Sequence, residues 1–127
     1  MDGDRLLEIL AHSVALGLLT GDESKVMISA HIAASRAIGE PFVAAKSYSF
    51  GTSSLSQRVS ALGSLMLQHR LKAPPKEVYS LHRRLSGSYL ACIKLNASVK
   101  CDDILHHVMQ NYDWGAAPMS SAKSIRQ

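Results

Sequence analysis

Residues 74–95, PPKEVYSLHRRLSGSYLACIKL, are the stretch that decides the fold. Apolar side chains recur in this stretch at intervals of three and four residues, the spacing that gathers them on one face of an α-helix: Val78, Leu81, Leu85, Tyr89, Cys92 and Ile93. Pro75 stands where a helix tolerates proline best, in its first turn. The pattern therefore predicts one long helix over residues 75–95.

The same spacing predicts four more helices, over residues 4–19, 22–38, 54–69 and 102–114. Thr20-Gly21 is a stop signal for the first, and a capping box from Thr20 to Glu23 opens the second. A second capping box, from Ser54 to Gln57, opens the third, and Asp102 is positioned to cap the last. The sequence thus predicts an all-α fold of about five helices.

The predicted second helix has an unusually small apolar face, formed by Val26, Met27, Ala30, Ala33, Ala34 and Ala37. Small side chains let a neighbouring helix approach closely, so we expect this helix to be internal. Gly39-Glu40-Pro41 is expected to end it, because proline cannot continue a helix. Residues 41–53 should form a loop, held by Phe42, Tyr48 and Phe50, with no partner strand in view.

Composition excludes several classes of protein. The chain has 127 residues, 46% hydrophobic and 19% charged, with a net charge of +4. That length fits one domain or part of one. Its basic residues are scattered and its aromatic residues few, which argues against nucleic-acid binding. Two cysteines do not make a disulfide framework, the acidic first residues do not resemble a targeting peptide, and residues 9–20 are too short to span a bilayer.

The most suggestive metal ligands are two cysteines and two neighbouring histidines: Cys92, Cys101, His106 and His107. The cysteines are nine residues apart and adjacent histidines diverge on a helix, so neither pair has zinc-site spacing. Asp102 and Asp103 suit a helix cap better than a metal site. His31 and His82 lie on apolar helices, where hydrogen-bonded histidines within the core are expected.

Nucleophile and phosphate motifs are missing as well. Ser86-Gly87-Ser88 falls inside the predicted long helix, where no strand-to-helix turn exposes a hydroxyl, and Gly51-Thr52 is no phosphate loop. A glycine inside a helix costs roughly 1 kcal/mol, so Gly87 predicts the close approach of another helix. The sequence therefore supplies no catalytic, cofactor-binding or metal-binding residue.

Residues 74–87, continuing through Leu90, Cys92, Lys94 and Leu95, closely resemble the C-terminal region of AarF/UbiB-type atypical kinases, and most of all the mitochondrial members that support coenzyme Q biosynthesis. Other blocks agree in the same order, among them Thr20-Gly21, Ala30-His31, Gly39-Glu40 and Phe50-Gly51-Thr52. The resemblance extends over about residues 4–112.

What the resemblance implies is a kinase-like C-lobe, of which residues 1–114 would be the terminal helical part and residues 115–127 a disordered tail. Family members bind ATP with a divalent metal at the mitochondrial inner membrane, on the matrix side. Their nucleotide loop, Lys-x-Gly-Gln motif and metal-binding Asp precede the matched region, so no catalytic residue transfers to this chain. ATP and Mg²⁺ are expected only for a full-length member.

Two interpretations remain open. In the first, the chain is a fragment or truncated product that supports the missing N-terminal part of the kinase-like domain. Its partners would then include proteins of a coenzyme Q biosynthesis complex and inner-membrane lipid, and an extended apolar patch should be exposed. In the second, it is an independent helical module that binds protein or lipid. A metalloenzyme is the least supported class.

Overall fold

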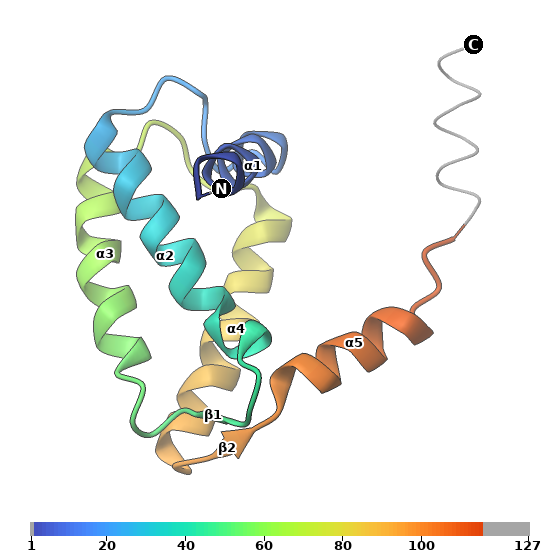
Figure 1. Cartoon of the computed structure of the whole chain (residues 1–127). Helices are drawn as coiled ribbons and strands as arrows, with labels where there is room; N and C mark the ends of the chain where they lie inside the picture. The colour runs from blue at the N-terminus through green and yellow to red at the C-terminus, as the bar shows by residue number, and fades with distance from the viewer. Residues whose placement is uncertain (1, 116–127) are drawn as a thin grey trace.

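The computed structural model describes residues 2–115. It contains five α-helices and two short strands in this order: α1 (Asp2–Ala15), α2 (Lys25–Val43), β1 (Tyr48–Ser49), α3 (Leu55–His69), α4 (Lys76–Lys94), β2 (Ser98–Val99) and α5 (Cys101–Asn111). In Figure 1, α2 lies in front of α4 with α3 beside it, α1 lies across one end, and α5 projects from the other end. The all-α prediction is confirmed. The proposed tail from residue 116 onward lies outside the described residues.

The central helix is α2, as its small side chains predicted. Its buried residues are Met27, Ala30, His31, Ala34, Ala37 and Pro41. Alanines on this face let α3 lie close, and α2 and α3 form the most extensive helix pair of the described chain. Ala33, which the sequence placed on the same face, is exposed instead.

A hydrophobic core forms where α2, β1, α3 and α4 meet. Its buried members are Ala37, Tyr48, Phe50 and Leu55, against which Tyr89 and both cysteines pack. The Phe50 ring lies edge-on to Tyr48, with ring centres 4.9 Å apart, and 5.5 Å from the Tyr89 ring. The Tyr89 hydroxyl donates a hydrogen bond of 2.5 Å to the carbonyl of Ile38, which joins α4 to α2.

The two strands correct the prediction that residues 41–53 form only a loop. β1 pairs with β2 antiparallel, with Tyr48 opposite Val99 and Ser49 opposite Ser98. The amide of Phe50 extends the ladder to the carbonyl of Ala97 at 3.0 Å. A two-residue strand whose partner lies about fifty residues away leaves no alternating pattern in the sequence, so the local signal could not reveal it.

Three helix ends also differ from the prediction. α1 ends at Ala15 rather than Leu19, because Gly17 takes a left-handed φ of 78°. A Cβ at Gly17 would lie 2.9 Å from Cγ of Pro75, so the same glycine admits the turn before α4. α2 runs past Gly39 to Val43, with Pro41 inside its last turn. At that position proline costs the helix only one backbone hydrogen bond, close to its end. α5 ends at Asn111 rather than Trp114.

The three predicted helix caps differ from the structure in position or in bonding. Glu23 accepts hydrogen bonds from the amides of Thr20 and Gly21, but these close a loop, and Ser24 is the residue that caps α2. Ser54 precedes α3 with a left-handed φ of 55° and its side chain makes no capping bond. Asp102 lies within the first turn of α5 rather than at its cap. Short polar residues near a helix start are plentiful, and the backbone decides which of them caps.

Candidate functional site

A cleft lies between α3 and α4, with Ile38 of α2 at its floor. It encloses about 400 Å³. Most of its lining is apolar, with a few hydroxyls and one imidazole among the side chains: Leu55, Ser56, Val59, Ser60, His82, Leu85, Ser86, Tyr89, Leu90 and Ile93. A cleft of this size and character is the usual form of a binding or active site.

α4 forms one wall of this cleft, and none of its residues is buried. Leu81 is 62% exposed and Tyr79 is 55% exposed, and neither of them lines the cleft. His82 is exposed at the cleft wall, so the prediction that it packs in the core is wrong. Gly87 likewise has no atom within 4 Å of the place a Cβ would occupy, so the helix predicted to approach it is not among the described residues.

His31 does pack in the core, as predicted, and it joins α2 to α1. Its Nε2 lies 2.7 Å from Oγ of Ser13, and both residues are 5% exposed. The Ser13 hydroxyl donates its one hydrogen to the carbonyl of Ile9 at 2.7 Å. Nε2 of His31 must therefore carry the proton and donate it, which identifies the neutral tautomer. The bond holds α1 in place, and in this tautomer the basic lone pair of His31 lies on Nδ1.

We expect the free energy of unfolding to fall as the pH falls below about 6.5. Burial lowers the pKa of His31, helped by nearby His82 and opposed by Glu23. The unfolded chain then binds the proton at a higher pH than the folded chain does. The stability that is present above pH 6.5 is therefore lost as the pH falls towards the pKa of His31 in the folded chain. The loss is about 1.4 kcal/mol for each unit by which folding lowers that pKa. Urea unfolding at several pH values measures this. His31→Gln should remove the slope between about pH 6.5 and about pH 5, above the range in which the carboxylates titrate. His12→Gln, a change at an exposed position of α1, should keep it. Equal slopes in all three proteins over this range would contradict the assignment.

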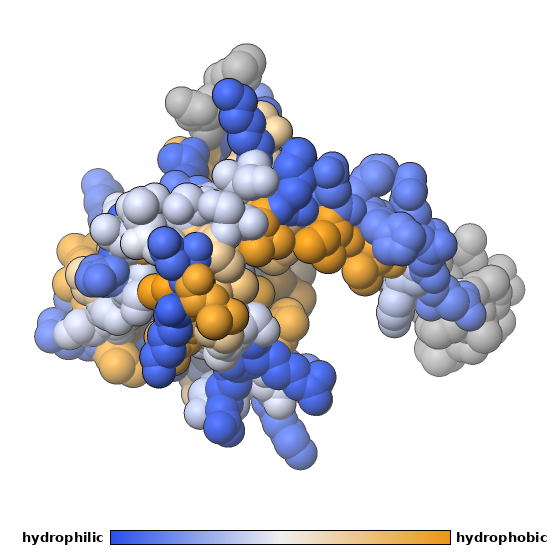
Figure 2. Space-filling view, turned by 90° about the horizontal axis from the view of Figure 1, so that it is seen from below, coloured by the Kyte–Doolittle hydropathy of each residue, from blue (hydrophilic) through white to orange (hydrophobic). Residues whose placement is uncertain are grey.

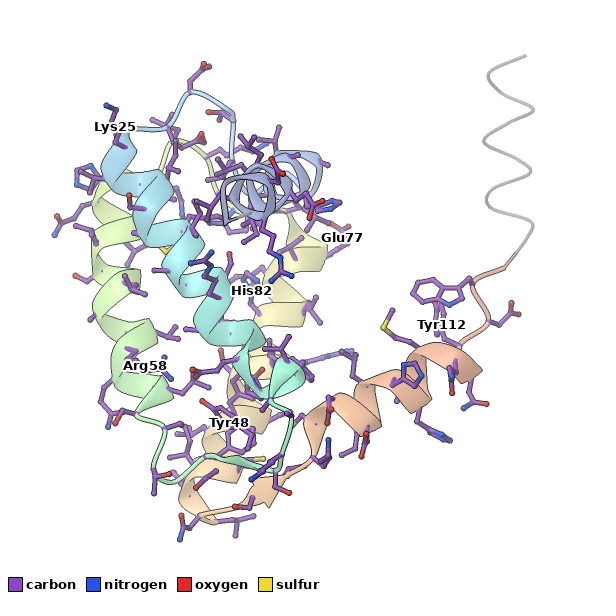
Figure 3. All side chains as sticks on the ribbon, in the orientation of Figure 1. Lys25, Tyr48, Arg58, Glu77, His82 and Tyr112 are labelled. Atoms are coloured by element: carbon purple, nitrogen blue, oxygen red, sulfur yellow. The ribbon has the colours of Figure 1, made fainter. Side chains whose placement is uncertain are left out.

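A polar cluster ties three elements together beside the core. The carboxylate of Glu40 on α2 accepts hydrogen bonds from the Tyr48 hydroxyl at 2.6 Å and from Arg58 of α3 at 2.5 Å. Those bonds lower the pKa of Glu40, and burial together with Glu40 raises the pKa of Tyr48. Figure 3 shows Tyr48 and Arg58 near one another at the β1 end of α3. The three groups have hydrogen-bond partners within the cluster, so its role is to hold α2, β1 and α3 together.

The four residues of the zinc hypothesis are not brought together. Cys92 and Cys101 are free thiols packed on the core, and burial raises the pKa of Cys101, which makes it a poor nucleophile and ligand at neutral pH. His106 and His107 instead pair with Gln110 and Asn111 along α5. Within residues 2–115 no three His, Cys, Asp or Glu side chains gather as a metal site would require.

The second notable surface is one face of α5. The face that carries Cys101 onto the core continues along the helix as an exposed apolar stripe beyond the body of the molecule: Ile104, Leu105, Val108, Met109 and Tyr112. Figure 2 shows an apolar band along the projecting helix, with hydrophilic residues beside it, and Figure 3 shows Tyr112 at the far end of that helix. The sequence predicted the helix from Ile104, Leu105 and Val108 but not that the face would lie open. No helix of the described chain is long and apolar enough to cross a membrane.

Comparison with known proteins finds relatives of this chain among mitochondrial atypical kinases. Atypical kinase coq-8, mitochondrial, of Caenorhabditis elegans is 41% identical over 114 residues, which is 90% of this chain and 15% of the relative. Atypical kinase COQ8B, mitochondrial, of Rattus norvegicus is 42% identical over 111 residues, 87% of this chain and 21% of the relative. Atypical kinase COQ8, mitochondrial, of Saccharomyces cerevisiae is 43% identical over 98 residues, 76% of this chain and 20% of the relative.

The chain thus spans about a fifth or less of the length of the curated relatives it matches. No protein-family model matches it. The expected resemblance is confirmed by these relatives, and their names place them in mitochondria.

Proposed function

Because this chain is homologous to one segment of the COQ8 atypical kinases, we propose that it is the C-terminal helical part of a kinase-like lobe that supports coenzyme Q biosynthesis. Its role is structural. It supplies a folded helical support on which the nucleotide-binding part of such a kinase rests. Phosphoryl transfer needs positioned charges around the phosphates, and no metal-holding cluster lies within residues 2–115, so the proposal assigns no step of that chemistry to this chain.

One observation carries the proposal. The stretch with the nearest resemblance to the family, residues 74–95, forms α4, and α4 has no buried residue in the described chain. A helix with apolar side chains on several faces is normally surrounded by other elements. Tyr79, Leu81 and Leu95 are more than half exposed, and Gly87 faces open space. We take these features as the side of the lobe that the rest of the kinase covers.

The partners and location follow from the same proposal. The first partner is the nucleotide-binding part of a COQ8-type kinase, with ATP and Mg²⁺ held there. Proteins of a coenzyme Q biosynthesis complex and inner-membrane lipid are further partners, and the matrix side of the inner membrane is the location. The mitochondrial names of the relatives support the compartment. The open face of α5 is the one observation that favours the second candidate, a helical module that binds protein or lipid by itself.

A chimera tests the proposal in a cell. The segment of Saccharomyces cerevisiae COQ8 that matches this chain over 98 residues is replaced by the corresponding residues of this chain, and ubiquinone is measured in a strain that lacks its own COQ8. We expect ubiquinone to return, because segments that are 43% identical should fold alike. The same chimera with Phe50→Ala should accumulate poorly and restore much less. A stable chimera that reaches mitochondria and leaves ubiquinone at the level of the deletion strain would refute the proposal.

A further inference from the structure

We infer that Ser86 is a phosphorylation site for an arginine-directed serine kinase. Residues 83–86 read Arg-Arg-Leu-Ser, and Arg83 and Arg84 are the only adjacent pair of Lys or Arg residues in the sequence. Kinases of this class select their substrates by charge, because carboxylates in their peptide groove pair with guanidinium groups shortly before the serine. The inference stands apart from the proposed function, since it uses this segment of α4 and no property of the relatives.

Both guanidinium groups are available to such a kinase. Arg83 and Arg84 are exposed, and neither forms an ion pair with a carboxylate of the described residues. The Arg83 guanidinium lies 6.0 Å from the centre of the Tyr79 ring, a contact worth only about 0.5–1 kcal/mol at an exposed site. A carboxylate of the kinase therefore has little to displace.

The Ser86 hydroxyl is available as well. Ser86 is exposed, and no hydrogen bond joins its hydroxyl to another residue of the described chain. The Ser88 hydroxyl, by contrast, donates a hydrogen bond of 3.0 Å to the carbonyl of Arg84. Ser88 also lies two residues further from the arginine pair, so the sequence and the structure select the same serine.

The segment has to leave its helical conformation, because a kinase binds its substrate as an extended chain. α4 is suited to this, since it has no buried residue. The α4 residues that pack on the hydrophobic core, Tyr89, Cys92 and Ile93, all follow the serine. Gly87 weakens the helix further, by about 1 kcal/mol relative to alanine. Elements with few buried contacts open locally at low free energy, so residues 83–87 can open while the contact with the core remains.

The reaction transfers the γ-phosphoryl group of ATP to the serine. The Ser86 oxygen forms a bond to the γ-phosphorus, the bond from that phosphorus to the oxygen shared with the β-phosphate breaks, and ADP leaves. The hydroxyl proton passes to a base of the kinase. The new phosphate carries a charge between about −1.5 and −2 at pH 7. Because Ser86 lines the mostly apolar α3–α4 cleft, this charge makes the cleft less suited to an apolar ligand.

The test uses the purified full chain with a serine kinase of the cyclic-AMP-dependent type, Mg²⁺ and ATP. Mass spectrometry of proteolytic peptides locates the phosphate, and we expect it on Ser86. Ser86→Ala should remove it, whereas the matched change Ser88→Ala should leave it. Arg84→Gln should lower the initial rate at least about tenfold, because a charge-assisted bond to the kinase is lost. Arg70→Gln, at an exposed arginine outside the motif, should leave the rate unchanged.

Circular dichroism checks that each variant is folded, and a peptide of residues 79–93 is the unfolded reference. The folded chain should react more slowly than the peptide, because its helix must open first. Three outcomes would overturn the inference: a folded wild-type chain that gains no phosphate, whether or not the peptide does; phosphate on a residue other than Ser86; or equal rates for Arg84→Gln and Arg70→Gln. The chain alone is the substrate, so none of these outcomes depends on whether the rest of a COQ8-type kinase covers α4.

Discussion

Replacing Phe50 with alanine is expected to lower the free energy of unfolding by about 3–5 kcal/mol, among the largest effects of a single truncation within the described residues. Phe50 is 2% exposed and is among the largest fully buried side chains of the described residues. Directly after β1, it joins the chain to α4 through its contact with the Tyr89 ring. A loss of this size is a large part of the stability of a small domain, so much of the variant should be unfolded at 37 °C.

Urea unfolding followed by circular dichroism measures the effect. Tyr79→Ala is the matched control, because it removes an aromatic ring that is 55% exposed, and it should change stability far less. Similar losses from Phe50→Ala and Tyr79→Ala would mean that the aromatic cluster around β1 is not the core.

The helices were predictable from the sequence where apolar spacing and end signals agree. Residues 54–69 and 75–95 were placed within a residue or so of α3 and α4, because strong periodicity over four or five turns leaves little freedom. The ends of α1 and α2 could not be predicted in this way. Four residues are typical of a helix end, namely Gly17, Gly21, Gly39 and Pro41, and tertiary contacts decide at which of them the helix ends. Pairing of β1 with β2 depends on contacts between residues far apart, which no local pattern encodes.

The candidate surfaces were harder to predict from the sequence than the helices. The apolar residues that line the cleft were identified as helix faces, but the separation of α3 from α4 depends on how α2 lies between them. The only sequence signal for the buried hydrogen bond between Ser13 and His31 is that each polar residue interrupts an apolar helix face. The close approach of another helix that was predicted at Gly87 is not found within the described chain, where no atom lies within 4 Å of the place a Cβ would occupy.

Gly87 provides the second large expected effect. If the rest of a COQ8-type kinase packs on α4, Gly87→Leu should weaken that association at least about tenfold by blocking close approach. The isolated chain should meanwhile become more stable by up to about 1 kcal/mol, since leucine favours a helix more than glycine does. Damage to folding would move both quantities the same way, so the opposite signs separate a docking role from a folding role.

Gly63→Leu in α3 is the matched control. Gly63 is also a helical glycine with no atom within 4 Å of the place a Cβ would occupy, but it belongs to α3 rather than to α4. We expect the substitution to stabilise the isolated chain in a similar way and to leave the association unchanged.

The most direct measurement is the binding of this chain to Caenorhabditis elegans coq-8 from which the matched 114 residues have been removed. Isothermal titration calorimetry with the two purified polypeptides should show saturable binding of one chain to each truncated kinase, lost with Gly87→Leu and kept with Gly63→Leu. The absence of binding between two folded polypeptides, or binding that is indifferent to Gly87, would contradict the account that this chain is a helical support for the rest of such a kinase.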